Sequence, residues 1–299
     1  MVKRLEEQRR DITKKLEITT KHANSNKRKA VHFWKLWRQQ QAPQNKIRRE
    51  PRQIERDNLK KCRSTDELIG EGRFGCCKKM MYRGRVVAVK HFKDCSDKAV
   101  HNEAATISEL DHPGLPFIFG VCTKQQPFLL VMEYYGINGT SVTIARALKG
   151  KMLFGQPEWT DVVLQCSKAI AYLHSKGKIH CDLKADNIVL QDSDGVTRPV
   201  IIDFGKVKDI TTAKTKKLSL VDQEFYRKRH KHIAPEIVRG THPPSTASDV
   251  YAFGLIISLI CHYYKFENLR RIAVQCIHGT PEKRPSMDAI ITTLDNNSV

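Results

Sequence analysis

The sequence predicts an α+β fold of two lobes preceded by a basic arm, and three features of the chain support this. Residues 1–63 contain no glycine and are rich in Lys and Arg. From residue 64 onward, glycines alternate with short apolar stretches, a pattern typical of strands and tight turns. From about residue 141, apolar residues recur at helical spacing. We therefore expect a small strand-rich lobe with one main helix over 64–134, and a larger, mainly helical lobe over 135–299.

The arm carries most of the positive charge of the chain. Residues 1–63 hold 20 Lys and Arg against 7 Asp and Glu, a net charge of +13 out of +20 for all 299 residues. Short amphipathic helices are predicted over 5–20 and 30–41, the second with Trp34 and Trp37. Such helices contact acidic membranes or partner grooves, and a basic segment can also bind nucleic acid. The alternative interpretation is a solvated helical arm, or one packed on the neighbouring lobe.

Cysteine usage and hydropathy indicate the compartment. The nine cysteines form no Cys-x-x-Cys pair, which argues against a zinc ribbon or a thioredoxin-like site and fits reduced thiols. No stretch approaches the roughly eighteen apolar residues of a membrane span, and the N-terminus lacks an apolar signal core. We expect a cytoplasmic protein without a transmembrane segment. Nuclear import through Lys27-Arg28-Lys29 remains open.

A glycine string marks the start of the first lobe. Residues 70–75 read G-x-G-x-x-G, a spacing shared by dinucleotide-binding folds and by flaps that cover ATP. A dinucleotide fold needs a helix directly after the glycines. Here the stretch 76–82 leads through Arg83-Gly84-Arg85, a hairpin turn, into a second strand over 86–89. A strand–loop–strand flap over phosphates therefore fits better.

The second strand ends at a lysine with an expected acidic partner. Alternation along the strand places Ala88 and Lys90 on the same face. The small Ala88 leaves room for an adenine, and Lys90 can reach phosphates. Glu103 lies within a predicted helix over 96–110 and is the expected partner of Lys90. Glu109 suits this role less because it lies near the end of that helix.

Later segments complete the two lobes. The apolar stretches 117–121 and 128–133 predict further strands of the small lobe. The stretches 162–174 and 250–263 show helical apolar spacing. No internal repeat is present, so the two lobes are built differently, with a cleft expected between them.

Two neighbouring loops carry the groups that phosphoryl transfer requires. Asp182 can orient a substrate hydroxyl and accept its proton, and Lys184 can stabilise the transferred group. Asn187 and Asp203 offer the oxygen ligands that Mg²⁺ prefers. Each residue alone is commonly a turn or cap residue. Their joint presence, in order with the glycine string and Lys90, indicates transfer from ATP.

These motifs resemble the eukaryotic protein kinase family over about residues 64–295. Lys184 is typical of the serine/threonine type, and Cys276 ahead of Glu282–Ser286 is similar to the tyrosine-kinase-like group. The matching positions are Gly70, Gly72, Gly75, Lys90, Glu103, Asp182, Lys184, Asn187, Asp203-Phe204-Gly205, Ala234-Pro235-Glu236, Ser248 to Gly254 and Arg284-Pro285.

The resemblance implies a complete set of functional positions. Catalysis would use Asp182, Lys184, Lys90 and Glu103, with Asn187 and Asp203 holding Mg²⁺. Asp249 would brace the catalytic loop, and Arg284 would pair with Glu236. The ATP site would comprise Ile69, Gly70, Gly72, Phe74, Gly75, Cys77, Ala88, Lys90, Met132, Glu133, Tyr135 and Val189.

The chain departs from the family pattern in its substrate-side loop. Cys181 replaces the arginine that usually binds a phosphorylated activation loop, and we hypothesise that activity needs no such phosphorylation. Arg229 and His232 stand where a threonine and a tyrosine are usual. The basic stretch 226–232 either favours acidic or phosphorylated substrates or is a solvated loop.

A further departure concerns the large lobe. Arg284 follows Asp249 by only 35 positions, so one helix that is usual in the family is expected to be missing. The predicted function is a serine/threonine protein kinase that acts on protein substrates. The alternatives are an ATP-binding pseudokinase scaffold, tyrosine or dual specificity, or a nucleic-acid- or membrane-binding module driven by the arm.

Overall fold

The computed structural model describes residues 51–62, 68–72, 75–93, 95–150, 152, 154–193 and 195–296. Apart from Ser193–Val196, they belong to one compact unit, Arg49–Asp192 with Thr197–Val299. The helices predicted over 5–20 and 30–41 lie outside the described residues, and so does Phe74.

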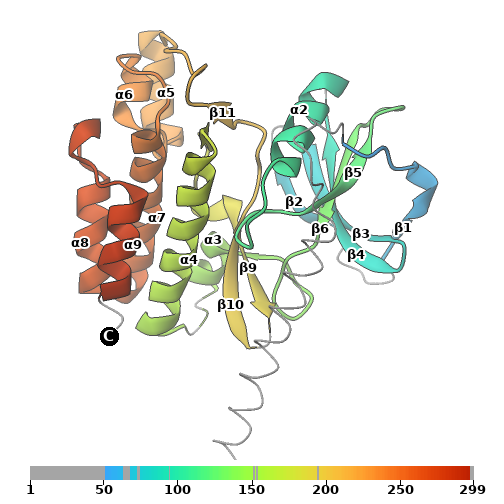
Figure 1. The fold of residues 1–299 in the computed structure, drawn as a ribbon, viewed down its shortest axis with the longest axis horizontal. Helices are drawn as coiled ribbons and strands as arrows, with labels where there is room; N and C mark the ends of the chain where they lie inside the picture. The colour runs from blue at the N-terminus through green and yellow to red at the C-terminus, as the bar shows by residue number, and fades with distance from the viewer. Residues whose placement is uncertain are drawn as a thin grey trace, which may run out of the picture. The chain divides into compact units, whose positions relative to one another are not determined.

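A twisted antiparallel sheet forms the small lobe (Figure 1). Its strand order is β1-β3-β4-β6-β5, with β2 paired to β3. The hairpin between β3 and β4 turns at Arg83 and Gly84, which both have positive φ, as a two-residue turn of this kind requires. This is the predicted strand–loop–strand arrangement. The strands are β1 (Leu59–Lys61), β2 (Leu68–Gly72), β3 (Gly75–Tyr82), β4 (Arg85–Phe92), β5 (Ile118–Cys122) and β6 (Leu129–Glu133).

Residues 51–62, which the sequence analysis placed in the basic arm, lie against this sheet. Ile54 is buried with residues of the sheet, and its backbone N–H donates to Val121. Leu59 is paired with Tyr82 as β1 extends the sheet beside β3. The packed chain therefore begins earlier than the change in composition near residue 63.

The main helix of this lobe is α2 (Asp97–Ser108), as predicted. The hydroxyl of Ser96 accepts a hydrogen bond from the N–H of Ala99, which caps the first turn. Its buried side chains recur at helical spacing, so one face packs inside the lobe: Val100, Glu103, Ala104 and Ile107.

The large lobe is mainly helical. Helices α4, α7, α8 and α9 lie side by side in Figure 1, and Trp159 of α4 and Phe253 of α7 are fully buried among them. Its helices are α3 (Ile144–Lys149), α4 (Gln156–Ser175), α5 (Leu220–Arg229), α6 (Pro235–Arg239), α7 (Thr246–Tyr264), α8 (Glu267–Cys276) and α9 (Met287–Asn296).

Short elements carry the functional loops of this lobe. The strands are β7 (Val142–Thr143), β8 (Lys178–Ile179), β9 (Ile188–Ser193), β10 (Val196–Ile201) and β11 (Lys208–Asp209). The 3₁₀ turns are η1 (Arg56–Asn58), in the small lobe, and η2 (Ala185–Asn187) and η3 (Pro281–Lys283).

Helix α7 contains the apolar stretch near residue 250, and its short connection to α8 leaves no room for the missing helix. Among the described helices, α7 alone is long and apolar enough to cross a membrane by length and composition, and half of its most apolar window is buried within the fold. Only Lys265 and Phe266 separate it from α8. No additional helix lies between α7 and α8 in this fully described stretch, which agrees with the short spacing in the sequence.

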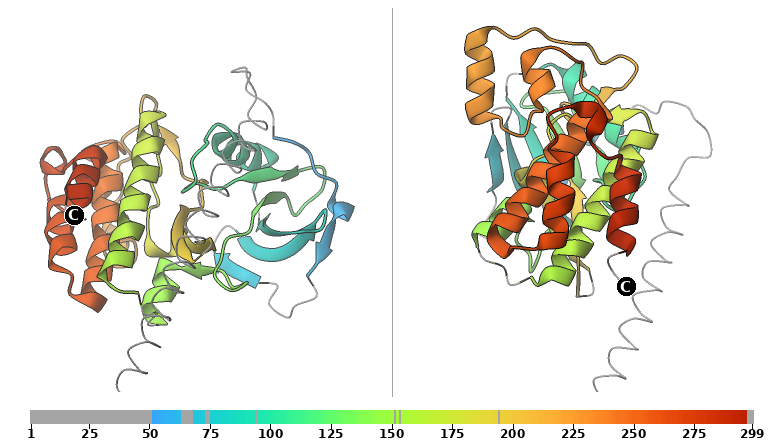
Figure 2. Two further views of the ribbon diagram at one scale, coloured as in Figure 1. Left: turned by 60° about the horizontal axis from the view of Figure 1, so that its bottom comes forward. Right: turned by 90° about the vertical axis from the view of Figure 1, so that its left-hand side faces the viewer.

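The basic stretch 226–232 is not a loop throughout. Its first residues complete α5, which is capped by Ser219 and lies beside α6 (Figure 2). Leu220, Val221 and Phe225 of α5 are exposed. After α5 ends at Arg229, the chain turns inward and buries most of His232.

Candidate active site

Lys90 links three elements of the fold. Its ammonium group on β4 lies 2.8 Å from the Glu103 carboxylate on α2 and 2.9 Å from Asp203 Oδ1. Burial opposes a charge on Lys90, but the two carboxylates outweigh it and raise the pKa of Lys90. The lysine therefore stays charged at the position where phosphates are expected. The predicted Lys90–Glu103 pair is present, whereas Glu109 contacts Lys178.

Two glycines allow close approaches at this point. A Cβ on Gly205 would lie 3.1 Å from the Glu103 carboxylate. Gly75 has a φ of +144°, and a Cβ there would overlap the carbonyl oxygen of His91. Both positions therefore favour glycine for a physical reason, one beside the ion pair and one where β3 begins.

The predicted ATP-site residues that the structure describes lie on several strands. Ile69, Gly70 and Gly72 lie on β2, Cys77 on β3, Ala88 on β4, Met132 and Glu133 on β6, and Val189 on β9; Tyr135 follows β6. In the sheet register, Cys77 pairs with Lys90, and Ala88 pairs with Met132. Burial raises the pKa of the Cys77 thiol to about 12. The thiol therefore stays protonated, and Cys77 behaves as a small apolar residue at its predicted place in the ATP site.

The catalytic loop, residues 180–187, follows β8 and is held in place by Asp249 of α7. Asp249 accepts backbone hydrogen bonds from His180 at 2.8 Å and from Cys181 at 3.0 Å. Cys181 adopts a positive φ of 63°, an unfavourable conformation for a cysteine that this double contact stabilises. The brace expected from the resemblance is therefore present, and it fixes the backbone directly before Asp182.

Hydrogen-bond donors surround the carboxylate of Asp182, whose side chain is 3% exposed. Lys206 and the His232 ring both lie 2.9 Å from Oδ1, and Lys184 lies 3.3 Å from Oδ2. Burial alone would raise the pKa of Asp182. These donors outweigh burial and hold its pKa well below the usual range, so the group stays an anion.

Asn187 and Asp203 fit the requirements of a divalent cation. The amide nitrogen of Asn187 donates to the carbonyl oxygen of Asp182 at 2.9 Å, and the amide oxygen makes no hydrogen bond to a described residue. Burial opposes ionisation of Asp203, but Lys90 lowers its pKa. One carboxylate oxygen and one oriented amide oxygen are the donor types that Mg²⁺ prefers.

A buried ion pair ties the end of the segment from Asp203 to Glu236, the activation segment, to the large lobe. The guanidinium of Arg284 contacts both carboxylate oxygens of Glu236, at 2.7 and 2.8 Å. The same guanidinium donates to the carbonyl oxygens of Ala247 and His278. This bidentate contact is the one that the resemblance implied.

The sequence predicted neither the contact of Lys206 with Asp182 nor that of His232 with Asp182. Lys206 directly follows the Asp203-Phe204-Gly205 triplet, and His232 was identified only as a replacement for a usual tyrosine. Both contacts join residues far apart in the chain, 24 and 50 positions from Asp182. The only available signal was the departure from the family pattern at His232.

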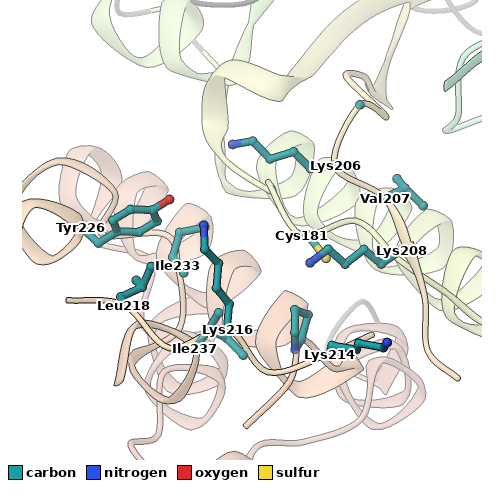
Figure 3. A pocket seen from close by; sticks show the side chains of 12 residues that line it. Cys181, Lys206, Val207, Lys208, Lys214, Lys216, Leu218, Tyr226, Ile233 and Ile237 are labelled. Atoms are coloured by element: carbon teal, nitrogen blue, oxygen red, sulfur yellow. The ribbon is translucent and has the colours of Figure 1, made fainter. Parts of the chain in front are cut away.

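An open cavity of about 410 Å³ lies along the activation segment and is also lined by Cys181, the residue before Asp182. Four lysine side chains line it, together with Cys181 and apolar residues (Figure 3). No Asp or Glu is among its lining residues. The lining lysines are Lys206, Lys208, Lys214 and Lys216.

The family model described as "Protein kinase domain" matches residues 63–274. The chain belongs to the protein kinase family. Mitogen-activated protein kinase kinase kinase 7 of Homo sapiens is 31% identical over 196 residues, covering 64% of this chain and 30% of that protein. This relative agrees with the similarity to the tyrosine-kinase-like group seen in the motifs.

Two further relatives are named as serine/threonine kinases. A probable leucine-rich repeat receptor-like serine/threonine-protein kinase of Arabidopsis thaliana is 31% identical, covering 77% of this chain and 26% of that protein. Serine/threonine-protein kinase C of Synechocystis is 27% identical, covering 75% of this chain and 44% of that protein. The chain thus spans less than half the length of these curated relatives.

Proposed function

We propose that this protein transfers the γ-phosphoryl group of ATP to serine or threonine hydroxyls of protein substrates. The observation that carries the proposal is the position of Lys90, which contacts Glu103 and Asp203 at once. This arrangement joins the phosphate-binding lysine, the helix α2 and the metal-binding aspartate in one connected unit. The serine/threonine relatives and Lys184 support the choice of hydroxyl.

The residues of the chain have separate tasks in this transfer. Lys90 holds the ATP phosphates. Asp182 orients the substrate hydroxyl and accepts its proton, and Lys184 offsets charge on the transferred group. Asn187 and Asp203 would hold Mg²⁺, which supplies charge neutralisation at the phosphate oxygens when bound.

A hydroxyl reaches Asp182 by replacing one of its present donors. Lys206 is the donor that can leave, because its side chain is 44% exposed, against 15% for His232. His232 and Asn187 then keep the carboxylate oriented while the hydroxyl takes the vacated position. The serine or threonine oxygen forms a bond to the γ-phosphorus of ATP. At the same time, the bond between that phosphorus and the departing ADP breaks.

We further infer that activity does not depend on a phosphorylated activation loop. Cys181, which stands where the family usually has an arginine, provides no positive charge on the catalytic loop that could link such a phosphate to it. His232 and Lys206, which belong to the activation segment, contact Asp182 directly instead. These contacts connect the segment to the catalytic loop without any phosphate.

The deciding experiment is a kinase assay with the full chain, ATP and Mg²⁺ on generic protein and peptide substrates, followed by phosphoamino-acid analysis. We expect phosphoserine and phosphothreonine, abolished by Asp182→Asn and retained after phosphatase treatment of the enzyme. Phosphotyrosine would indicate tyrosine or dual specificity. Activity that requires loop phosphorylation would refute the inference about Cys181.

An ATP-binding scaffold without turnover is the second candidate. The donors that already surround Asp182 favour it, because a hydroxyl must displace one of them. ATP binding by the full chain, together with equal background phosphorylation from the Asp182→Asn variant, would establish this alternative.

A further inference from the structure

Three of the lysines that line the cavity along the activation segment have no counter-charge among the residues that the structure describes. The ammonium groups of Lys208, Lys214 and Lys216 make no hydrogen bond or ion pair with a residue that the structure describes. The fourth, Lys206, is the exception because it contacts Asp182. Like charges that face one cavity repel each other, and an anion placed between them removes this repulsion.

The acids nearby are already engaged. Asp209, next to Lys208 in sequence, pairs with Lys178 at 2.7 Å. Asp182 is surrounded by its own donors. The positive charge of the cavity is therefore available to a ligand rather than cancelled by the protein.

The shape and lining of the cavity indicate more than a free ion. About 410 Å³ exceeds what one inorganic anion fills and lies in the range of sites for larger ligands. Figure 3 shows Lys208, Lys214 and Lys216 around the space, with Ile233, Ile237 and Leu218 along one side. Apolar walls beside cationic groups suit a charged side chain that arrives on a peptide.

The location of the cavity connects it to the acceptor hydroxyl. Cys181, which lines the cavity, directly precedes Asp182, and Lys206 both lines the cavity and contacts the Asp182 carboxylate. When the acceptor hydroxyl of a peptide lies at Asp182, the peptide residues next to the acceptor therefore lie near the opening of this cavity.

We propose that this cavity binds a phosphorylated side chain of the protein substrate, close in sequence to the residue that receives the new phosphate. A phosphoserine or phosphothreonine carries a charge of about −1.5 to −2 and three acceptor oxygens, which three lysines can share. The serine and threonine residues of the surrounding segment, Thr211, Thr212, Thr215 and Ser219, are exposed and do not line the cavity, and Tyr226 is the one hydroxyl residue among the lining residues. The phosphate is therefore expected from the substrate.

The proposal rests on the proposed kinase function, so its test separates binding from turnover. The first measurement uses fluorescent peptides that have a single fixed phosphothreonine, scanned over the positions flanking a central alanine. Alanine in place of the acceptor prevents transfer. Anisotropy at physiological ionic strength should show at least tenfold tighter binding for one placement of the phosphothreonine than for the unphosphorylated peptide.

The variant pair Lys214→Gln with Lys216→Gln should remove this difference. Lys217→Gln is the matched control, because Lys217 lies in the same segment, is exposed and does not line the cavity. It should bind like the wild-type protein. Equal binding of phosphorylated and unphosphorylated peptides to the wild-type chain would overturn the proposal, whatever the enzyme's activity.

The second measurement uses the same peptides with serine at the centre. The preferred phosphopeptide should have a KM at least tenfold lower, and the double variant should lose this preference while the control keeps it. Selective binding without any turnover would refute the kinase function but not the anion site. Phosphate found on Thr211, Thr212, Thr215 or Ser219 that competes with peptide binding would instead assign the cavity to the protein's own loop and overturn the proposal.

Discussion

The imidazole of His232 lies 2.9 Å from the carboxylate of Asp182 and so joins the activation segment to the catalytic loop. The contact is largely shielded from water, because the two side chains are only 15% and 3% exposed. A hydrogen bond to a charged group in such a place contributes about 1.5–3 kcal/mol. If Asp182 acts as proposed, this contact orients its carboxylate to a degree that kinetics can detect.

Replacing His232 with alanine should lower kcat about tenfold to a hundredfold, the factor that corresponds to about 1.4–3 kcal/mol in the transition state. The cause is the loss of one oriented donor while Lys206 leaves to admit the hydroxyl. His242→Ala, at an exposed histidine of the same lobe, is the control and should keep wild-type kcat. An increase in kcat for His232→Ala would show that the contact is inhibitory.

The Lys90–Glu103 pair gives a prediction for stability. Lys90→Ala should destabilise the protein by about 3–5 kcal/mol, because the carboxylate of Glu103 remains buried without its partner. It should also weaken ATP binding. Urea unfolding and nucleotide titration measure the two effects.

Lys93→Ala is the matched control for this prediction. Lys93 pairs with Glu71 at 3.1 Å, but both side chains are exposed, so the loss should be about 0–1 kcal/mol. Similar losses for Lys90→Ala and Lys93→Ala would contradict the difference in burial that the structure assigns to the two pairs.

The thiol of Cys77 should resist alkylation at neutral pH. Burial raises its pKa to about 12, so only about one molecule in 10⁴ carries the thiolate at pH 8. The rate of reaction with iodoacetamide should rise about tenfold per pH unit toward that pKa. Peptide mass spectrometry follows the modification, and the protein unfolded in urea provides the control. Rapid labelling of Cys77 in the folded protein at pH 7 would refute the assignment.

Local patterns indicated the Lys90–Glu103 pair and the residues of the two functional loops, whereas several ATP-site positions came from the resemblance. The positions of Lys90 and Glu103 follow from strand alternation and the extent of one helix, and both are short-range properties of the chain. The pairing of Glu236 with Arg284 came from the resemblance rather than from any pattern, since 48 residues separate them. The helix α2 and the turn at Arg83 and Gly84 were likewise predicted from the sequence, although the Ser96 cap was not.

The remaining features depend on packing between distant segments. His232 contacts Asp182 only because the chain turns inward after α5. No periodic pattern in the sequence predicts that turn. The same reason hid the role of residues 51–62. Ile54 and Leu59 are isolated apolar residues in a basic segment. Their packing partners are residues of the small-lobe sheet, which come together only in the folded protein.

The pair of Arg284 and Glu236 provides the last prediction. The Arg284 side chain is fully buried and holds the carboxylate through two parallel hydrogen bonds, a geometry that lysine cannot reproduce. Arg284→Lys should therefore lower the free energy of unfolding, and Arg284→Gln should lower it further, by about 3–5 kcal/mol, because Glu236 is then a buried charge without a partner. Arg271→Gln, which breaks an exposed pair with Glu267 on α8, should change it by less than about 1 kcal/mol. Chemical denaturation of the three variants measures the series, and an Arg284→Lys variant as stable as the wild-type protein would show that charge alone, without the bidentate geometry, stabilises this junction.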